Sequence, residues 1–411
     1  MSTAAPRRRQ AAVAFILVTA LLDVMSMGIV IPVLPSLIEQ LAGGSSARAG
    51  FWTGLFMALW AFMQFVCSPI IGSLSDRFGR RPVILVSIAG LAADYVLMAV
   101  APNLWWLALG RILGGITSSS FTTVFAYMAD ITEPEKRARG YGLIGAAFSA
   151  GFVAGPLVGG LLGEISPRAP FWAAAVIAAA AFVYGAFILP ESLPPEKRMA
   201  FAWGRANPFG ALRLLRSHPE LSSLAVMNFL VYFAHHVFSA VFVLYAGQRY
   251  GMSPWQVGML LAFTGVLDMV VQGVLVGPVV KRLGDRTAML FGLACGVVGL
   301  SCMGLAPTGL LFTLAMIPNA GWGFAMPTIQ SLMTRHVSES EQGQLQGANN
   351  SVAAIAGSVS PLFFGIIYSM SVGTAPILPF IGMAFLAAAA VMALATVIGW
   401  RATPAEVAAG H

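Results

Sequence analysis

The chain has 411 residues, of which 58% are hydrophobic and only 9% are charged, whereas a soluble domain carries roughly a quarter charged residues. This composition excludes a string of ordinary water-soluble domains. The net charge of +7 does not indicate a nucleic-acid partner, because the basic residues stand singly or in short groups between apolar runs rather than on one continuous face.

The sequence contains none of the catalytic or metal-binding motifs that would indicate an enzyme. Cys67, Cys295 and Cys302 lie inside apolar runs without CxxC or Cys/His spacing, so neither a disulfide framework nor a metal site is predicted. The P-loop, HExxH and GxSxG motifs are absent from the sequence. We therefore expect no catalytic residues, no cofactor and no ATP hydrolysis by this chain itself.

The first apolar run begins after Arg7, Arg8 and Arg9, as the core of a signal peptide would. It continues past Asp23 to Pro32, lacks an obvious small-residue cleavage site and is long enough to span a bilayer. We expect it to be a retained membrane helix.

Apolar runs of about the length that crosses a bilayer fill the rest of the chain. They predict an all-α membrane protein of twelve transmembrane helices in two six-helix bundles. The predicted divisions are residues 1–190 for the N-terminal bundle, 191–220 for a cytoplasmic linker and 221–411 for the C-terminal bundle. The runs lie near 11–34, 51–72, 82–101, 104–128, 139–162, 170–190, 221–246, 255–279, 286–306, 309–333, 344–370 and 375–400.

Lys and Arg residues indicate the orientation, because cytoplasmic loops carry an excess of them. With the amino terminus inside, the cytoplasmic segments hold 19 of these residues, and the opposite loops hold only Arg48, Arg168 and Arg249. Both termini and the linker are therefore predicted to be cytoplasmic.

A weak internal repeat favours two related, pseudo-symmetric halves. The sequence GSLSDRFGRR, from Gly72 to Arg81, follows the second run, and GPVVKRLGDR, from Gly277 to Arg286, follows the eighth. Parallel six-helix repeats with a site between them are a recognised transporter plan. A channel or a membrane enzyme has no need of such duplication. A sensor or a channel stays an alternative, but duplicated halves with buried acids suit alternating access better than a pore.

The loop from Gly72 to Pro82, GSLSDRFGRRP, resembles the signature loop of the major facilitator superfamily. Its glycines allow tight turning, its aspartate can accept charge-assisted hydrogen bonds, and its arginines face the cytoplasm. These features suit a latch that favours one state of a rocking bundle, although the arginines would also serve topology alone. The latch candidates are Gly72, Asp76, Arg77, Gly79, Arg80 and Arg81.

The fifth run carries small residues four positions apart together with a proline, a pattern that resembles the antiporter branch of the superfamily. Backbones can pack closely and bend at such a place. The functional interpretation is a hinge between inward and outward states, and the alternative is ordinary small-residue packing. The hinge candidates are Gly151, Gly155, Pro156 and Gly159.

Charged residues within membrane spans mark ion and proton pathways, because each is costly to insert. Asp23, Asp94, Arg111 and Asp268 are such residues and are the proton-coupling candidates. A short turn at 101–103 joins the runs of Asp94 and Arg111, so these two side chains can pair. Asp23 would also suit helix packing through the small residues that follow it.

A few polar or aromatic residues within spans are candidate substrate contacts, since a mostly apolar pocket with some polar groups suits an amphipathic ligand. Asp268 has Gln272 one turn later on the same face. Most such residues serve helix packing in membrane proteins, which is the alternative here. The substrate-binding candidates are Gln64, His235, Asp268, Gln272, Asn319 and Trp322.

The chain is most similar to the tetracycline/proton antiporters, and the resemblance rests on residues 22–35, 91–95, 163–167 and 341–347. It implies coupling roles for Asp23, Asp94 and Arg111. The second half departs from that family, because Asp268 stands where a histidine is expected and residues 286–305 lack an expected aspartate, with Cys295 nearby.

The resemblance implies a monomeric, multi-pass protein of a bacterial inner membrane. We expect it to export a hydrophobic or amphipathic drug, tetracycline-like or related, in exchange for protons by alternating access. The energy source is the proton gradient, and the partners are the drug, protons and the lipid bilayer. The alternative is a proton-coupled symporter for a small nutrient or metabolite.

Overall fold

Two compact units make up the computed structural model of the chain. The first comprises Met1–Gly44, Leu59–Pro208 and Ser253–Ala262, and the second comprises Ser45–Ala58, Phe209–Met252 and Phe263–His411. The residues described are 4–118, 120–133, 136–201, 207, 210, 212–215, 219–338, 341–373, 376–378 and 380–403. Within these ranges every regular element is a helix, which confirms the all-α prediction.

The units do not divide the chain at a single point. Residues 45–58 belong to the second unit and residues 253–262 belong to the first, although the predicted bundles assign them the other way. The described part of the predicted linker is itself divided: residues 191–201 and 207 belong to the first unit, and residues 210, 212–215 and 219–220 belong to the second. Two six-helix bundles therefore stay a prediction.

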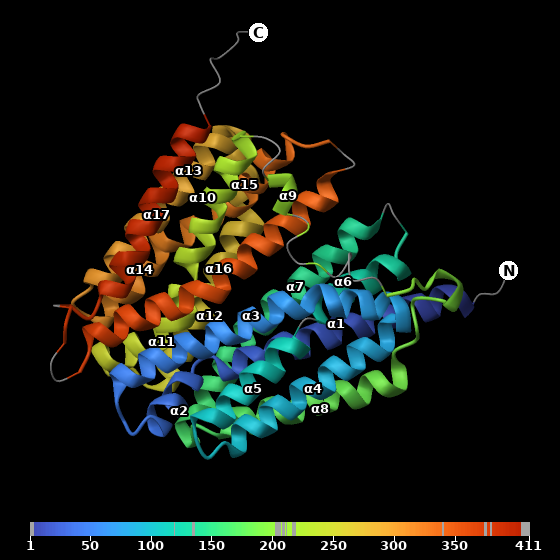
Figure 1. The fold of residues 1–411 in the computed structure, drawn as a ribbon, viewed down its shortest axis with the longest axis horizontal. Coiled ribbons are helices and arrows are strands. Elements are labelled where there is room, and N and C mark those ends of the chain that lie inside the picture. Colours follow the sequence, from blue (N-terminus) through green and yellow to red (C-terminus); the bar gives the residue numbers. More distant parts are fainter. Residues whose placement is uncertain are drawn as a thin grey trace, which may run out of the picture. The chain divides into compact units, whose positions relative to one another are not determined.

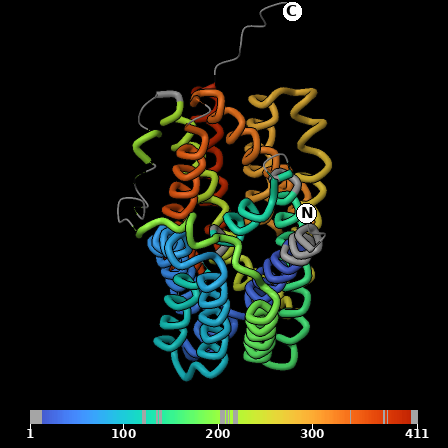
Figure 2. The backbone as a smooth tube through the Cα atoms, turned by 90° about the vertical axis from the view of Figure 1, so that its right-hand side faces the viewer, coloured from blue at the N-terminus to red at the C-terminus, as the bar shows by residue number. Residues whose placement is uncertain are grey.

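Long helices lie side by side in the first unit (Figures 1 and 2). α1 packs along α7 and α8, and α4 packs along α5 and α8. The helices that contribute to this unit are α1 Ala4–Val30, α2 Leu34–Leu41, α3 Ser46–Phe78, α4 Arg80–Val100, α5 Leu104–Thr117, α6 Ser120–Ile131, α7 Arg137–Ile165, α8 Ala169–Ile188, the short 3₁₀ helix η2 Pro195–Lys197, and the start of α12 Pro254–Val270.

The turn between α4 and α5 is held by side chains that satisfy helix ends. The Asn103 side chain caps α5 by accepting hydrogen bonds from the backbone N–H groups of Trp105 and Trp106, at 3.1 and 3.3 Å. Arg168 donates to the carbonyl oxygens of Ala99 and Ala101, at 2.6 and 2.7 Å, where α4 ends. This turn places α4 and α5 in contact as antiparallel neighbours, as predicted.

In the second unit, α13 packs along α14 and α17, and α10 packs along α16 and α17 (Figure 1). The first part of α3 and the end of α12 also belong to this unit. The remaining elements are α9 Leu212–Leu215, α10 Pro219–His235, α11 Val237–Tyr250, the π-helical turn η3 Val271–Leu275, α13 Val276–Leu305, α14 Gly309–Ala320, the 3₁₀ turn η4 Gly321–Phe324, α15 Ala325–Thr334, α16 Gln342–Ser371 and α17 Met383–Ala402.

Two irregular turns of the second unit pack against each other. The π-helical turn η3 contributes Val271 to a buried cluster, the 3₁₀ turn η4 contributes its last residue Phe324, and α14 contributes its last residue Ala320. Gly284 breaks α13 with a φ of +75° and a ψ of +161°, so two helices meet at that residue.

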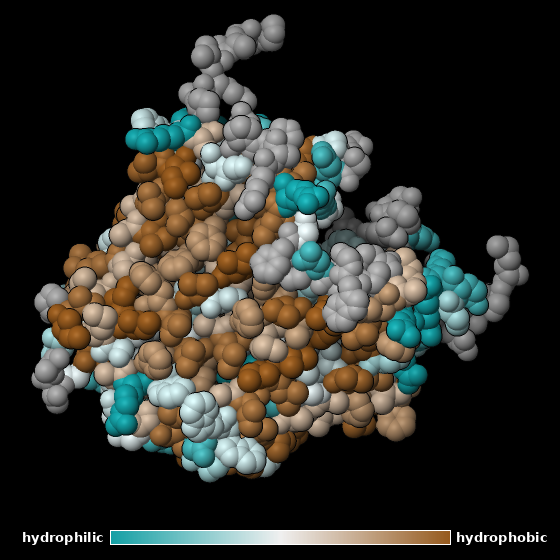
Figure 3. All heavy atoms as spheres, in the orientation of Figure 1, coloured by the Kyte–Doolittle hydropathy of each residue, from teal (hydrophilic) through white to brown (hydrophobic). Residues whose placement is uncertain are grey.

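Ten helices of the described residues are long and apolar enough to cross a membrane. The predicted runs at 255–279 and 286–306 lie in one 52-residue stretch, Pro254–Leu305, and the run at 104–128 is divided between α5 and α6. Apolar side chains face outward along the helices, as Phe187 does with 86% exposure, and brown residues cover much of the face in Figure 3. The chain is a multi-pass membrane protein.

Candidate functional site

Asp94 and Arg111 form a buried ion pair within the first unit. Asp94 lies on α4 and Arg111 on α5, and Arg111 Nη2 is 3.2 Å from Asp94 Oδ2. The side chains are 1% and 9% exposed, so water scarcely reaches either charge. Glycines of α5 make the room, because a Cβ at Gly110 would stand 2.7 Å from Asp94 Oδ1. The structure therefore brings the predicted pair together.

Each partner of this pair keeps one polar atom without a hydrogen bond. Among the described residues, no group bonds to Asp94 Oδ1 or to Arg111 Nε, although Arg111 Nη2 also lies 2.7 Å from Met98 Sδ. Leaving a buried polar atom unpaired is costly. Asp94 can thus bind a proton at Oδ1 while Oδ2 keeps its contact with arginine.

The backbone of Asp23 is linked to α4 through two hydroxyl groups. Asp23, on α1, is buried, and its backbone carbonyl accepts a 2.8 Å hydrogen bond from Ser26 Oγ. Ser26 Oγ in turn lies 3.3 Å from the hydroxyl oxygen of Tyr95, the residue after Asp94 on α4. Sequence reasoning missed Ser26 and the role of Tyr95, although both lie within three residues of a buried acid.

Small residues let α1 and α7 touch along their backbones. A Cβ on Gly155 would stand 2.7 Å from Gly28 Cα, and one on Gly151 would stand 2.8 Å from the Leu21 carbonyl oxygen. A Cβ on Gly159 would collide with the Ile29 carbonyl oxygen, which is closer still. The predicted small-residue motif is therefore a close contact, whereas its action as a hinge stays a prediction.

Pro156 also belongs to a contact that the sequence did not reveal. On its other face, α7 meets the start of α12, where a Cβ on Gly258 would collide with the Pro156 carbonyl and one on Gly160 would stand 2.6 Å from the Pro254 carbonyl. Beyond them, Glu164 Oε1 accepts a 3.0 Å hydrogen bond from the backbone N–H of Trp255.

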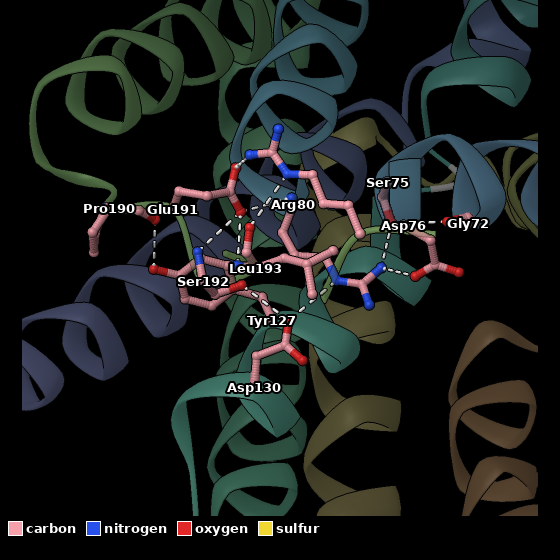
Figure 4. Close-up of polar contacts among 11 residues, drawn as sticks. Gly72, Ser75, Asp76, Arg80, Tyr127, Asp130, Pro190, Glu191, Ser192 and Leu193 are labelled. Carbon is pink, nitrogen blue, oxygen red and sulfur yellow. Dashed lines mark hydrogen bonds and ion pairs between the residues drawn. The ribbon is translucent and has the colours of Figure 1, made fainter. Parts of the chain in front are cut away.

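Arg80 is the centre of a polar cluster in the predicted latch loop (Figure 4). Its guanidinium lies between two carboxylates, with Nη1 2.6 Å from Asp76 Oδ1 and Nε 3.2 Å from Asp130 Oδ2. Nη1 also donates to Ser75 Oγ at 2.6 Å. Asp130 is in the last turn of α6, so the arginine ties the α3–α4 loop to that helix. We call Ser75, Asp76, Arg80 and Asp130 the Arg80 cluster.

Glu191, just after α8, caps the beginning of α4. Its Oε1 accepts hydrogen bonds from the backbone N–H groups of Arg80, Ser192 and Leu193, at 2.9 to 3.0 Å (Figure 4). The Tyr127 hydroxyl donates to the Pro190 carbonyl at 3.0 Å. Sequence reasoning missed these residues as parts of the latch, because they lie far from the loop along the chain.

The other latch candidates differ in what they contact. Gly79 has a φ of +105°, and a Cβ there would collide with the Glu191 carboxylate. A Cβ on Gly72 would meet nothing within 4 Å, so a side chain at this position would have open space. Arg77 lies over the Phe78 ring at 5.1 Å, and Arg81 donates to the Ala186 carbonyl at 2.7 Å.

The repeated loop of the second unit has a corresponding polar contact. Gly284 has a positive φ, as Gly79 does at the same place in the repeat. The next residue, Asp285, forms an ion pair with Arg335 and accepts a 3.0 Å hydrogen bond from Ser331 Oγ. Ser331 lies on α15 and Arg335 follows its end, so this loop too is tied to a neighbouring helix.

Five of the substrate-binding candidates lie in the second unit, and Gln64, partly buried on α3, lies in the first. His235 and Trp322 meet edge to face, with ring centroids 5.4 Å apart. A Cβ on Gly323, beside Trp322, would stand 3.5 Å from Gln272 Cγ. Asn319 is buried, and its Oδ1 has no hydrogen-bond partner among the described residues.

Asp268 stands on α12, partly buried, three residues before the π-helical turn. No described residue forms a hydrogen bond or an ion pair with its carboxylate. The described residues also hold no group of three His, Cys, Asp or Glu side chains that could bind a metal ion. Cys67, Cys295 and Cys302 have free thiols.

Comparison with known proteins identifies the family. Residues 16–361 match the Major Facilitator Superfamily. The chain is 38% identical to the class C tetracycline resistance protein of Escherichia coli, covering 87% of this chain and 90% of that protein. It is 34% identical to the class B protein of Escherichia coli, with coverage of 86% and 88%.

Solved structures share the fold at low sequence identity. A nucleoside transporter superposes with a TM-score of 0.80 at 12% identity, covering 96% of this chain and all of that one. A D-xylose–proton symporter superposes with a TM-score of 0.76 at 17% identity, covering 96% and 98%. The family matches indicate a transporter rather than an enzyme. The chain belongs to the major facilitator superfamily and is a member of its tetracycline-resistance-protein group.

Proposed function

We propose that this protein exports a tetracycline-like or related amphipathic drug across the bacterial inner membrane in exchange for protons. The relatives' names support the drug, and the buried Asp94–Arg111 pair carries the proton part of the proposal. We further propose a monomer that needs no cofactor besides the proton gradient. The organisms of the relatives support the inner membrane.

Alternating access requires two halves that rock about a central site. We propose twelve transmembrane helices in two six-helix bundles, with both termini and the 191–220 linker in the cytoplasm. Gly79 and Gly284 support the repeat, because both have a positive φ at corresponding places. The break of α13 at Gly284 supports two spans within the stretch Pro254–Leu305.

Proton exchange takes place at Asp94 in this proposal. The carboxylate of Asp94 is held by one oxygen, and a proton on Oδ1 neutralises it without displacing Arg111. In the protonated state the attraction to arginine weakens, so α4 and α5 can separate by small shifts that the close glycine packing of α5 permits. Asp23 and its Ser26–Tyr95 hydroxyl link carry the change to α1.

The same proposal assigns drug contacts within the second unit to Asp268, Gln272, Asn319, Trp322 and His235. Gln64 of the first unit is kept as a separate candidate. The His235–Trp322 pair supplies apolar ring surface. The unpaired Oδ1 of Asn319 supplies a hydrogen-bond acceptor that a drug hydroxyl or amide can use.

Inside-out membrane vesicles test the function directly. Vesicles that contain the protein should accumulate tetracycline when respiration acidifies their interior, and an uncoupler should release it. Asp94→Asn should abolish this uphill uptake, whereas Glu196→Gln, an exposed carboxyl of η2, should not change it. Uphill uptake by Asp94→Asn would remove Asp94 from coupling, and accumulation only in right-side-out vesicles would instead indicate a symporter.

A further inference from the structure

Four amide side chains form a hydrogen-bonded chain across three helices of the second unit. Asn228 on α10 donates from Nδ2 to Oδ1 of Asn349 on α16 at 3.4 Å, and Asn349 Nδ2 donates to Oε1 of Gln330 on α15 at 2.6 Å. Gln330 Nε2 then donates to Oε1 of Gln346, on α16 again, at 2.9 Å. We call these four residues the amide chain. Its hydrogen bonds all point the same way, so each polarises the next toward Gln346.

The amide chain runs from the interior of the unit to its surface. Asn228 and Asn349 are both 3% exposed, whereas Gln346 is an exposed residue. Amides that only hold membrane helices together bond to one another across the helix contact. The last amide of this chain differs, because no described residue accepts a hydrogen bond from Gln346 Nε2. The amide chain therefore ends on a surface with unused donors.

Asn350 adds a second free amide beside that end. It lies one turn after Gln346, so both side chains project from the same face of α16, with Cβ atoms roughly 6 Å apart. Asn350 is exposed, and its side chain has no hydrogen bond to any described residue. Both residues belong to the apolar stretch Gln342–Ser371, and lipid cannot pair with an amide. Water or a ligand must therefore pair with these two groups.

The amide chain lies on helices that also carry proposed drug contacts. Asn228 precedes His235 by seven residues on α10, and Gln330 follows Trp322 by eight, so each stands about two helical turns away. Both separations run toward the proposed cytoplasmic end, because α10 begins beside the proposed cytoplasmic linker and α15 runs the opposite way. A molecule that enters from the cytoplasm would meet the amide chain before the His235–Trp322 pair.

We propose that Gln346 and Asn350 form a polar subsite that recognises a planar edge of the exported molecule with two or more neighbouring carbonyl or enol oxygens. The proposal rests on the proposed drug export and names a substrate feature for it. Gln346 Oε1 already accepts from Gln330, so the Gln346 amide offers its N–H donors to an acceptor on the ligand. The amide chain also holds Gln346 in place, which lowers the entropic cost of binding.

Two isomeric dyes differ in this edge alone. In 1,8-dihydroxyanthraquinone the hydroxyl groups bond to the carbonyl between them, so three oxygens share one edge, whereas 2,6-dihydroxyanthraquinone has its oxygens spread around the rings. Binding to the purified protein in detergent at pH 6, where both dyes are neutral, is followed by quenching of protein fluorescence. The native protein should bind the 1,8 isomer about tenfold more tightly, which corresponds to two net hydrogen bonds.

Exposed positions of α16 provide the variants and their control. Gln346→Leu and Asn350→Leu should each lower the isomer preference to about threefold, because each removes one donor, and the double variant should remove it. Gln344→Leu, exposed on the same helix and outside the amide chain, should keep the full preference. If a leucine variant fails to fold, Gln346→Glu gives the readout, since its carboxylate replaces the donor at equal size and should also lower the preference.

The outcomes separate the subsite from drug export itself. Equal binding of the two isomers by the native protein overturns the subsite, and so does a full preference in the double variant or in Gln346→Glu. Tetracycline export by a protein without isomer preference would overturn only the subsite. Loss of all export with the isomer preference intact would overturn the proposed function and leave the subsite standing.

Discussion

Arg80 and Asp285 occupy corresponding positions directly after a positive-φ glycine in two repeated loops, and they carry opposite charges. Arg80 pairs with Asp130 at the end of α6, and Asp285 pairs with Arg335 after α15. The loop-to-helix attachment is thus present in both units with its polarity reversed. This reversal indicates that the attachment matters more than which partner is basic.

The reversed polarity predicts that the second ion pair tolerates exchange. Asp285→Arg places two arginines together and should lower thermal stability by about 1–2 kcal/mol through repulsion and the lost Ser331 hydrogen bond. Adding Arg335→Asp should restore most of this loss. Thermal unfolding of the purified variants measures both values. A double variant no more stable than Asp285→Arg would contradict the prediction.

Gly79 and Gly72 make a matched pair in one loop. Gly79→Ala should destabilise the protein by about 1–3 kcal/mol, because its φ of +105° strains any side chain and its Cβ would strike Glu191. Gly72→Ala should be neutral or stabilise by up to about 1 kcal/mol, since it lies inside α3 with open space around it. Thermal unfolding checks both, and equal effects would refute the assignment.

The contact between α1 and α7 predicts that two glycine-to-valine substitutions in α7 differ sharply in their effect on stability. Gly155→Val should prevent close approach to Gly28 and reduce folded protein severely, with a loss above about 3 kcal/mol from overpacking backbone against backbone. Gly145→Val, in the same helix with nothing within 4 Å, is the control. Yield of monodisperse protein and melting temperature report the difference, and similar behaviour of the two variants would disprove it.

The buried pair on α4 and α5 predicts strong coupling in stability. Arg111→Gln leaves Asp94 without its partner and should cost about 3–5 kcal/mol. Asp94→Asn combined with Arg111→Gln should be more stable than Arg111→Gln alone, because no uncompensated charge stays buried. A double-mutant cycle of melting temperatures provides the measurement. Additive effects would show that the two side chains do not interact.

The features predictable from the sequence are those carried by local patterns. Apolar runs predicted the helices, and the short turn at 101–103 brought Asp94 and Arg111 within reach. A repeat in two loops anticipated the shared conformation of Gly79 and Gly284. In each case the decisive residues lie close in sequence or recur at fixed spacing.

The missed features depend on contacts between distant residues. Glu191 caps a helix that begins 111 residues earlier, and Gly258 faces Pro156 across two helices. Neither residue type is unusual in its own segment, so composition gives no signal. The open space around Gly72 was equally invisible, because a glycine in a signature loop looks the same whether or not it is crowded.

The π-helical turn at Val271–Leu275 changes the direction in which the residues that follow it face. A π turn contains one residue more than an α turn, and one residue of an α-helix turns the chain by about 100°. Every residue from Val276 to Gly284 therefore faces a direction about 100° away from that of an unbroken helix. A single extra residue thus sets the angular register between Asp268 and the helical segment that precedes the break at Gly284.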